Sequence, residues 1–299
     1  MPTTRIIHLT DPHTTSLARV GARDLLSKRA LGYLSWRRKR RHRHTQHMLD
    51  ATVTAALAKS PDALVLTGDL LHIGLASEMQ QIRPWLQALA DQLPVLLVPG
   101  NHDLYAADSQ ELWQQELGDL PVFGTAVNAD RNYPRALQVN QVRILGLSSA
   151  YAAPLTRADG KLGEHQRQEL NRLLADAPNH QEKETEATLL ALHHPAEPTL
   201  AKERKSLLDA QELQHLMRSH QHKLTALVHG HLHENLSYSV AGTPCYCTAS
   251  ASSTDRNAMA SFRLLEFTGA TVNCRLFTAD ASADDQKTEH VEFSERAPE

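Results

Sequence analysis

The stretch Val95-Leu96-Leu97-Val98-Pro99-Gly100-Asn101-His102-Asp103 decides how this chain folds. Four consecutive apolar residues that precede Pro and Gly are typical of a short strand buried on both faces of a sheet. The polar side chains that follow then lie at the carboxyl end of the strand, where open α/β sheets bind their ligands. A polar turn after a core strand has the same pattern, so this stretch alone leaves both interpretations open.

Four further apolar strands are followed by side chains that can bind metal. These side chains are Asp11 and His13 after residues 5–9, Asp69 after 63–67, His193 after 189–192, and His231 and His233 after 224–228. A lone His or a Gly-Asp pair is more often structural, but five such strand ends in succession are hard to ascribe to chance. Helical patterns alternate with several of these strands, as over 45–58 and 78–93, which predicts parallel pairing with right-handed crossovers.

Composition places the chain among ordinary globular proteins. It has 299 residues, of which 41% are hydrophobic and 22% charged, enough for one large domain or two modest ones. Its three cysteines form neither a disulfide framework nor a zinc-binding spacing. No apolar run approaches the ~18 to 20 residues that span a bilayer. Cleavage of a signal peptide would remove the first strand and Asp11, so we expect a cytoplasmic protein, peripheral on the inner face of the membrane if the basic segment described below binds lipid.

Five motifs in this order resemble those of the calcineurin-like metallophosphoesterase family. They are Asp-x-His (11–13), Gly-Asp (68–69), Gly-Asn-His-Asp (100–103), His-His-Pro (193–195) and Gly-His-x-His (230–233). The resemblance covers about residues 5–235 and implies an α/β fold, a four-layer αββα sandwich of two mixed sheets with a two-metal site at the strand ends. We expect one domain over residues 1–279, with an insertion at about 17–44, and an acidic, disordered tail over 280–299.

The same resemblance assigns two divalent metal ions to seven side chains. One ion would be held by Asp11, His13 and His233, the other by Asn101, His193 and His231, and Asp69 would bridge both. His193 is chosen as the ligand in preference to His194. Oxygen and imidazole ligands without thiolate suit Mn, Fe, Zn or Co, among which Mn is preferred although the sequence does not decide.

The central motif also provides candidates for the chemistry. The resemblance implies attack by metal-bound hydroxide, with Asn101 and His102 on the substrate and His102 positioned to protonate the leaving group. Asp103 either orients His102 and keeps its pKa high, or is a simple turn carboxylate. Both interpretations of Asp103 stay open.

An unusual segment at about 17–44 lengthens the connection between Asp11 and Asp69. Six of the 31 Lys and Arg lie within residues 37–43, so the rest of the chain carries 25 − 34 = −9. The segment is either a helix packed on the domain with its basic end in solvent, or an interfacial helix on an anionic membrane surface. The second interpretation assigns membrane contacts to Leu34, Trp36, Arg37, Arg38, Arg40 and Arg41. Nucleic acid is a less favoured partner because the remainder is acidic.

These features predict a divalent-metal-dependent phosphohydrolase that cleaves a phosphodiester or pyrophosphate bond. The membrane interpretation adds a lipid-linked substrate such as UDP-diacylglucosamine, which some bacterial members of the family hydrolyse, or a membrane-associated phosphodiesterase. One alternative is a soluble nucleotide or nucleic-acid phosphodiesterase or phosphatase with the same site. A non-catalytic scaffold is disfavoured because all seven metal-binding residues are present.

Overall fold

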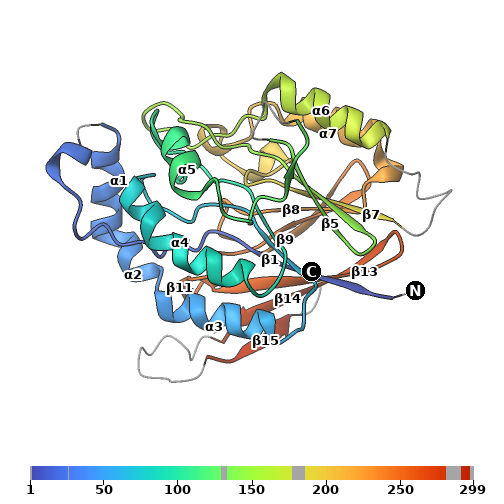
Figure 1. Cartoon of the computed structure of the whole chain (residues 1–299), viewed down its shortest axis with the longest axis horizontal. Helices are drawn as coiled ribbons and strands as arrows, with labels where there is room; N and C mark the ends of the chain where they lie inside the picture. Colours follow the sequence, from blue (N-terminus) through green and yellow to red (C-terminus); the bar gives the residue numbers. More distant parts are fainter. Residues whose placement is uncertain (1, 26, 129–132, 177–185, 281–290, 297–299) are drawn as a thin grey trace.

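Two mixed β-sheets pack face to face, and helices cover the outer surface of each sheet (Figure 1). This architecture is seen in a computed structural model, which describes residues 2–25, 27–128, 133–176, 186–280 and 291–296. The predicted four-layer sandwich is confirmed. Its layers bring the strand ends from both sheets to one region of the molecule.

The first sheet has the order β15-β14-β13-β1-β2-β3. Its strands are β1 (Thr4–Leu9), β2 (Ala63–Leu66), β3 (Val95–Leu97), β13 (Ser261–Thr268), β14 (Thr271–Ala279) and β15 (Phe293–Arg296). The first three are parallel, and Leu9, Leu66 and Leu97 lie in register across them. The polar residues that follow these three strands therefore meet at the same edge of the sheet.

The second sheet has the order β4-β5-β6-β7-β8-β10-β9. Its strands are β4 (Thr125–Ala126), β5 (Arg135–Val139), β6 (Val142–Gly146), β7 (Ala187–Ala191), β8 (Ala226–His229), β9 (Leu236–Val240) and β10 (Thr243–Cys247). Strands β6, β7 and β8 are parallel, which aligns the residues after β7 and β8 at one edge. A two-stranded ribbon, β11 (Thr254–Asp255) and β12 (Ala258–Met259), lies outside both sheets.

Three hydrophobic cores correspond to the three spaces between the four layers. Strand alternation separates them, because Ile6 faces the other sheet while Ile7 and Leu9 face the helices. The helices on the first sheet are α3 (Gln46–Leu57), α4 (Ala76–Ala90) and α5 (Ser109–Leu117), and those on the second are α6 (Gly163–Ala175) and α7 (Ala210–Ser219). Short turns of helix are η3 (Pro198–Leu200), η4 (Glu203–Lys205) and η5 (Gln221–Lys223). Thr45 begins α3 as its N-cap, with Oγ1 accepting a hydrogen bond from the Met48 amide at 3.2 Å.

The basic insertion begins with the short turn η1 (Ala22–Leu25) and continues as one uninterrupted helical stretch over residues 29–43. Its consecutive parts are α1 (Arg29–Ser35), the π-helical turn η2 (Trp36–Arg40) and α2 (Arg41–Arg43). Trp36 is buried against Leu17, Ile73 and Leu75, so its prediction as a membrane contact is wrong. The indole packs on the protein because the insertion folds back over the first sheet's edge. Within the described residues, no helix is long and apolar enough to cross a bilayer.

The tail is more ordered than predicted. The segment Phe293–Arg296 is strand β15 and pairs antiparallel with β14, so the prediction of disorder is wrong for these residues. Phe293 packs with Phe262, ring centroids 5.7 Å apart, and this apolar contact attaches an otherwise acidic segment. Residues 281–290 and 297–299 of the predicted tail lie outside the described part of the chain.

Candidate metal centre

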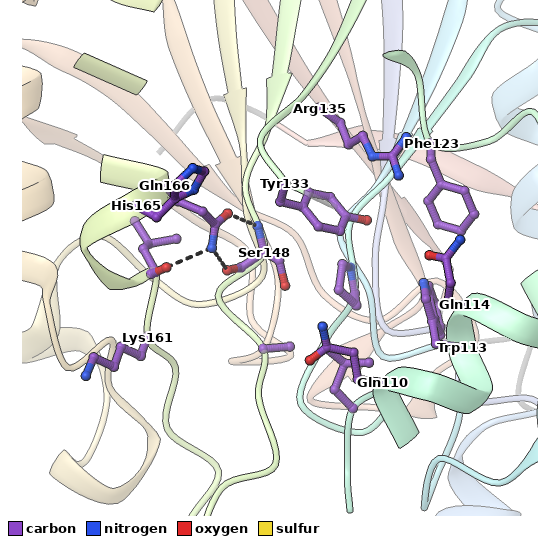
Figure 2. Close-up of a pocket in the computed structure, with 14 residues that line it drawn as sticks. Gln110, Trp113, Gln114, Phe123, Tyr133, Arg135, Ser148, Lys161, His165 and Gln166 are labelled. Atoms are coloured by element: carbon purple, nitrogen blue, oxygen red, sulfur yellow. Dashed lines mark hydrogen bonds between the residues drawn. The ribbon is translucent and has the colours of Figure 1, made fainter. Parts of the chain in front are cut away.

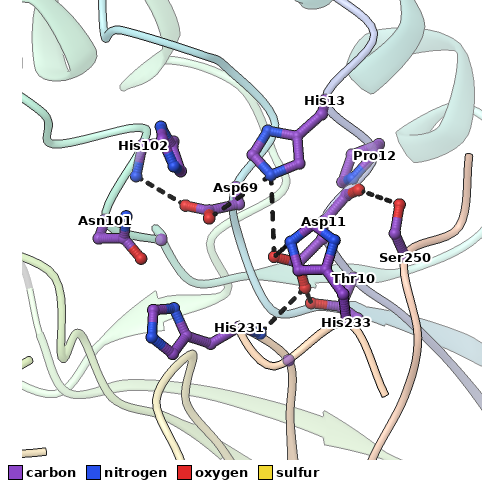
Figure 3. Close-up of polar contacts among 12 residues, drawn as sticks. Thr10, Asp11, Pro12, His13, Asp69, Asn101, His102, His231, His233 and Ser250 are labelled. Atoms are coloured by element: carbon purple, nitrogen blue, oxygen red, sulfur yellow. Dashed lines mark hydrogen bonds and ion pairs between the residues drawn. The ribbon is translucent and has the colours of Figure 1, made fainter. Parts of the chain in front are cut away.

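The ends of five strands place all seven predicted metal-binding side chains in one cluster. Figure 3 labels all of them except His193. They come from the segments after β1, β2, β3, β7 and β8, in both sheets. Six of the seven are buried, with exposed fractions of 0–5%, and the seventh, His233, is 34% exposed at its side chain. The cluster is therefore closed by the protein on most sides and open towards His233.

The first predicted triad has the spacing expected around a single ion. His233 Nε2 lies 3.3 Å from Asp11 Oδ1, and His13 Nε2 lies 4.0 Å from the same oxygen. One ligand atom from each of the three residues falls within 4.8 Å of the other two. Carboxylate oxygen and imidazole nitrogen at this spacing can share one divalent cation.

Asp69 lies between the first triad and the second set of residues. Its Oδ2 is 3.6 Å from His13 Nε2 and 3.4 Å from His193 Nε2. On the far side, His193 Nε2 is 3.2 Å from Asn101 Oδ1 and 3.3 Å from His231 Nδ1. A carboxylate in this position is suited to bridge two ions.

The donor set fits metal ions because two buried atoms of the candidate ligands have no hydrogen-bond donor. Among the described residues, Asp11 Oδ1 and His231 Nε2 are buried and have no hydrogen-bond partner. A buried polar atom without a partner costs about 1–3 kcal/mol, more for a charged group. Coordination of a divalent cation would remove this cost.

Hydrogen bonds behind the cluster fix the orientation of its side chains. His13 Nδ1 donates to the Leu71 carbonyl at 2.7 Å and His193 Nδ1 donates to the Thr67 carbonyl at 2.6 Å. Because a carbonyl only accepts, both rings carry a proton on Nδ1 and direct Nε2 to the cluster, where its lone pair can bind a cation once any proton on Nε2 has left. Asp11 Oδ2 likewise accepts from Thr10 Oγ1 at 2.6 Å, which leaves Oδ1 free.

The structure supports the choice of His193 in preference to His194. The His194 ring lies close to His231, with centroids 4.4 Å apart. Both of its nitrogens are nevertheless engaged, Nδ1 with Ser149 Oγ at 2.8 Å and Nε2 with the Ala158 carbonyl at 3.3 Å. His194 therefore supports the neighbouring strand ends, and one of its nitrogens also lies within 4.8 Å of ligand atoms of His193 and His231.

The backbone is strained at most of the candidate ligands. Five of them have φ in the left-handed region, namely Asp11 (50°), His13 (45°), Asp69 (54°), His231 (69°) and His233 (57°). Each such non-glycine residue costs on the order of 1–3 kcal/mol and clusters of them are typical of functional sites. The fold thus tolerates local strain in order to direct these side chains inward.

Two motif positions must be glycine because candidate ligands lie too close to them for any side chain to fit. A Cβ on Gly230 would overlap Thr10 Oγ1 and Asp11 Oδ2, and a Cβ on Gly100 would overlap the Asp69 carboxylate. Any larger residue would displace a candidate ligand. Gly100 and Gly230 are therefore part of the site's construction.

The structure corrects the interpretation of Asp103 as the residue that orients His102. Its carboxylate accepts hydrogen bonds from the amides of Gly100 at 2.8 Å, Asp69 at 2.8 Å and Leu71 at 3.0 Å. Both oxygens are used in this way. Asp103 thus joins the turns after β2 and β3, as the alternative interpretation of a turn carboxylate requires.

His102 is held by other groups. Its amide donates to Asp69 Oδ1 at 2.7 Å, and its Nδ1 donates to the His72 carbonyl at 2.6 Å. Burial, followed by the charge of Arg40, lowers the pKa of His102 well below its usual value, so the prediction of a high pKa is wrong. The neutral ring then has an acceptor at Nε2, which has no partner among the described residues.

Charge within the cluster shifts its pKa values in opposite directions. For His193, burial lowers the pKa, but the Asp69 charge and hydrogen bond outweigh it and raise the value to about 9. Burial disfavours ionisation of Asp11, yet the charge of His233 leaves its pKa lowered. The site therefore attracts cations strongly at neutral pH.

Two neighbours of the cluster were not predicted to belong to it. The His44 ring lies 5.0 Å from that of His13, and Arg40 Nη1 lies 3.0 Å from His102 Nδ1. Both residues come from the basic insertion, so the prediction of Arg40 as a membrane contact is wrong. A run of basic residues carries no local signal that tells which member turns inward.

A cavity of about 450 Å³ adjoins the turn between β3 and α5 (Figure 2). Pro99 and Leu104, which flank the central motif, form part of its wall. Its other lining side chains are mainly aromatic, amide and basic, including Trp113, Phe123, Tyr133, Gln166 and Lys161. None of the seven candidate metal ligands lines it, so the cavity lies beside the cluster and not around it.

Comparisons with known proteins identify the family of this chain. The family model described as calcineurin-like phosphoesterase matches residues 4–235. The chain is 28% identical over 180 residues to a probable cyclic nucleotide phosphodiesterase of Synechococcus sp., covering 59% of this chain and 59% of that protein. It is 30% identical over 142 residues to the glycerophosphodiester phosphodiesterase GpdQ of Enterobacter lignolyticus, covering 48% of this chain and 45% of that protein.

A solved structure shares the fold. A dimetal phosphatase from Danio rerio superposes with a TM-score of 0.58 at 14% identity, over 93% of this chain and 95% of that one. At this identity the likeness concerns the fold alone. The matched part of this chain spans less than two thirds of the length of either sequence relative.

Proposed function

Because this chain belongs to the calcineurin-like phosphoesterase family, we propose that it is a divalent-metal-dependent phosphohydrolase acting on a phosphodiester. The observation that carries the proposal is the position of Asp69 Oδ2, 3.6 Å from His13 Nε2 and 3.4 Å from His193 Nε2. That arrangement suits a carboxylate shared by two ions, and pairs of ions are typical of phosphoryl-transfer hydrolases.

In this proposal the seven clustered side chains hold two ions. Asp11, His13 and His233 bind one, Asn101, His193 and His231 bind the other, and Asp69 binds both. Bound ions would supply Lewis-acid polarisation of the phosphate and activation of water. Mn, Fe, Zn and Co all suit these ligands, and we keep Mn as the first to test.

The protein's own groups orient the reactants. Nδ1–H bonds to the Leu71 and Thr67 carbonyls hold the rings of His13 and His193 in place. His102 directs Nε2 away from its anchored Nδ1–H and is the candidate to contact the phosphate and the leaving oxygen. Since its neutral Nε2 accepts, His102 must gain a proton before it donates one, and the negative charge of a substrate favours that gain.

A small phosphodiester is the best-supported substrate class. The two sequence relatives are named for cyclic nucleotides and glycerophosphodiesters. The cavity beside the central motif has aromatic and amide walls and a volume of about 450 Å³, which suits the organic part of a small ester. The lipid-linked alternative, with UDP-diacylglucosamine as the example, is supported only by exposed residues of the insertion such as Leu34.

The test is a substrate panel with metal-free and Mn-loaded protein. It should include bis-nitrophenyl phosphate, nitrophenyl phosphate, a cyclic nucleotide, a glycerophosphodiester and UDP-diacylglucosamine. We expect metal-dependent cleavage of the diesters with little cleavage of the monoester. If the protein prefers UDP-diacylglucosamine, its proposed substrate becomes a lipid-linked pyrophosphate instead of a soluble diester. If the metal-loaded protein cleaves none of the five compounds, the proposed function is contradicted.

A further inference from the structure

We propose that Arg40, delivered by the basic insertion, binds a phosphate oxygen of the substrate. The inference rests on the proposed function, since it concerns the phosphate that the metal cluster would hold. It adds to that function a substrate-binding residue that none of the five motifs contains. Four observations support it.

The first observation is the position of Arg40. It is the last residue of η2, is half-buried, and its Nη1 lies 3.0 Å from His102 Nδ1. The amide of His102 in turn donates to the central carboxylate, Asp69 Oδ1, at 2.7 Å. The guanidinium therefore lies directly beside the metal cluster.

The second observation is that Arg40 forms no ion pair with any described residue. Among the described residues, no carboxylate oxygen approaches its guanidinium within 4.0 Å. By contrast, Arg29 of the same insertion forms a 2.7 Å ion pair with Asp108. A buried or half-buried cation without a counter-ion is costly, which favours a site for an anion.

The third observation concerns the side-chain contact that Arg40 makes with His102. His102 Nδ1 is 2.6 Å from the His72 carbonyl, which can only accept, so this nitrogen carries a proton. Arg40 Nη1 also carries protons. The 3.0 Å contact is therefore between two hydrogen-bond donors and is not a favourable hydrogen bond. A phosphate oxygen can accept a hydrogen bond from the guanidinium, so Arg40 would move from His102 towards a bound substrate.

The fourth observation is that the insertion is fixed on both sides of Arg40. On one side Trp36 is buried in a small core and Arg29 bonds the carbonyls of Ile73 and Gly74. On the other side His44 Nδ1 bonds Ser252 Oγ at 2.9 Å. A guanidinium on a backbone held at both ends is pre-organised for a planar, charge-assisted contact with phosphate.

The test compares Arg40→Gln with Arg37→Gln, an exposed arginine of the same turn. Mn-loaded proteins are titrated with inorganic phosphate by calorimetry, and their metal content and diester hydrolysis are measured. We expect Arg40→Gln to keep both ions and to raise the Kd for phosphate about 10- to 100-fold, the loss usual for a hydrogen bond to a charged group. Arg40→Lys should retain part of the affinity, and Arg37→Gln should match the wild type.

Two results would overturn the inference. One is equal phosphate affinity in wild type and Arg40→Gln, and the other is loss of metal from Arg40→Gln, which would make Arg40 a support of the ligands. Failure of the proposed function is a separate outcome, because it shows in the wild type as absence of hydrolysis across the substrate panel. The phosphate titration decides the role of Arg40 in either case.

Discussion

At the scale of single residues, the candidate ligands divide their atoms between two tasks. Asp69 Oδ1 accepts from the His102 amide at 2.7 Å, while Oδ2 faces the imidazoles of His13 and His193. Asp11 divides its oxygens in the same way, with Oδ2 bound to Thr10 and Oδ1 free. One atom of each carboxylate builds the turn and the other is left for a cation.

Replacement of Asp69 by Asn tests this division. The amide removes the negative charge shared by both predicted ions and places an N–H group in the turn or in the cluster. Loss of a residue that only supports a metal ligand costs about 10–100-fold, so we expect at least about 100-fold lower diester hydrolysis with loss of bound metal. Metal analysis and turnover of Asp69→Asn check this, beside Asp50→Asn on the exposed face of α3. Full metal content with normal turnover would contradict the assignment.

His102→Ala separates chemistry from metal binding. The backbone amide that bonds Asp69 survives the substitution, so both ions should remain. Turnover should fall about 10²- to 10⁴-fold if the ring assists the leaving group. The loss should be smaller for nitrophenolate, which needs no proton, than for an alkyl leaving group. Equal losses with good and poor leaving groups would show that the ring has no proton-transfer role.

At the scale of elements, the basic insertion has an inner and an outer side. Trp36 and Arg40 turn towards the protein, whereas Arg37, Arg38 and Arg41 are exposed, and Leu34 is 40% exposed. The inner side is fixed by packing and hydrogen bonds. The outer side carries cationic charge, but the Trp36 indole faces inward and is not available to insert into lipid.

This division predicts weak, charge-driven binding to membranes. Each exposed cation contributes about 1 kcal/mol near an anionic surface, and salt screens the attraction over about 8 Å at physiological ionic strength. Sedimentation with anionic liposomes should therefore occur at low salt and vanish near 0.15 M, and combined Arg37→Gln, Arg38→Gln and Arg41→Gln should abolish it without loss of diester hydrolysis. Sedimentation that persists at high salt would show that apolar residues enter the bilayer. It would also support the proposal of a lipid-linked substrate.

At the scale of the whole molecule, the fold buries many histidines in their neutral form. Burial is the largest cause of a lowered pKa in six fully buried rings, those of His8, His13, His72, His194, His229 and His231. The values fall to about 3 for His72 and about 4 for His229. His193 is the exception, since Asp69 raises its pKa to about 9 against the effect of burial.

These shifts predict that the metal-free protein is sensitive to acid. Below about pH 6.5 these histidines bind protons in the unfolded chain but not in the folded protein. Each of them therefore lowers the free energy of unfolding by up to about 1.4 kcal/mol per pH unit, until the pH reaches its pKa in the folded state. His193 has the opposite sign, because its stabilisation is complete below pH 6.5 and is lost as pH rises to about 9. Urea unfolding should show stability falling steeply from pH 6.5 to 4 and more gently above 7. His47→Gln, at an exposed position of α3, should have the same profile, and constant stability between pH 7 and 5 would contradict the prediction.

The sequence by itself determined the fold and named the side chains of the cluster that we propose to hold metal. Apolar runs that end in Asp-x-His, Gly-Asp, Gly-Asn-His, His-His and Gly-His-x-His are local patterns. The strands β1, β2, β3, β7 and β8 form where those runs predict them, because burial on both faces needs continuous apolar residues. Parallel pairing then aligns the residues that follow, and the cluster forms from residues that the motifs already name.

Only the tertiary structure decided which groups surround that cluster. Asp103 bonds the amide of Asp69, 34 residues away, and no local pattern tells this contact from a contact with the adjacent His102. Trp36 and Arg40 have the same helical spacing whether they face lipid or fold back on the domain. An apolar or basic side chain specifies the kind of surface that it needs, but the packing of distant segments determines which surface it meets.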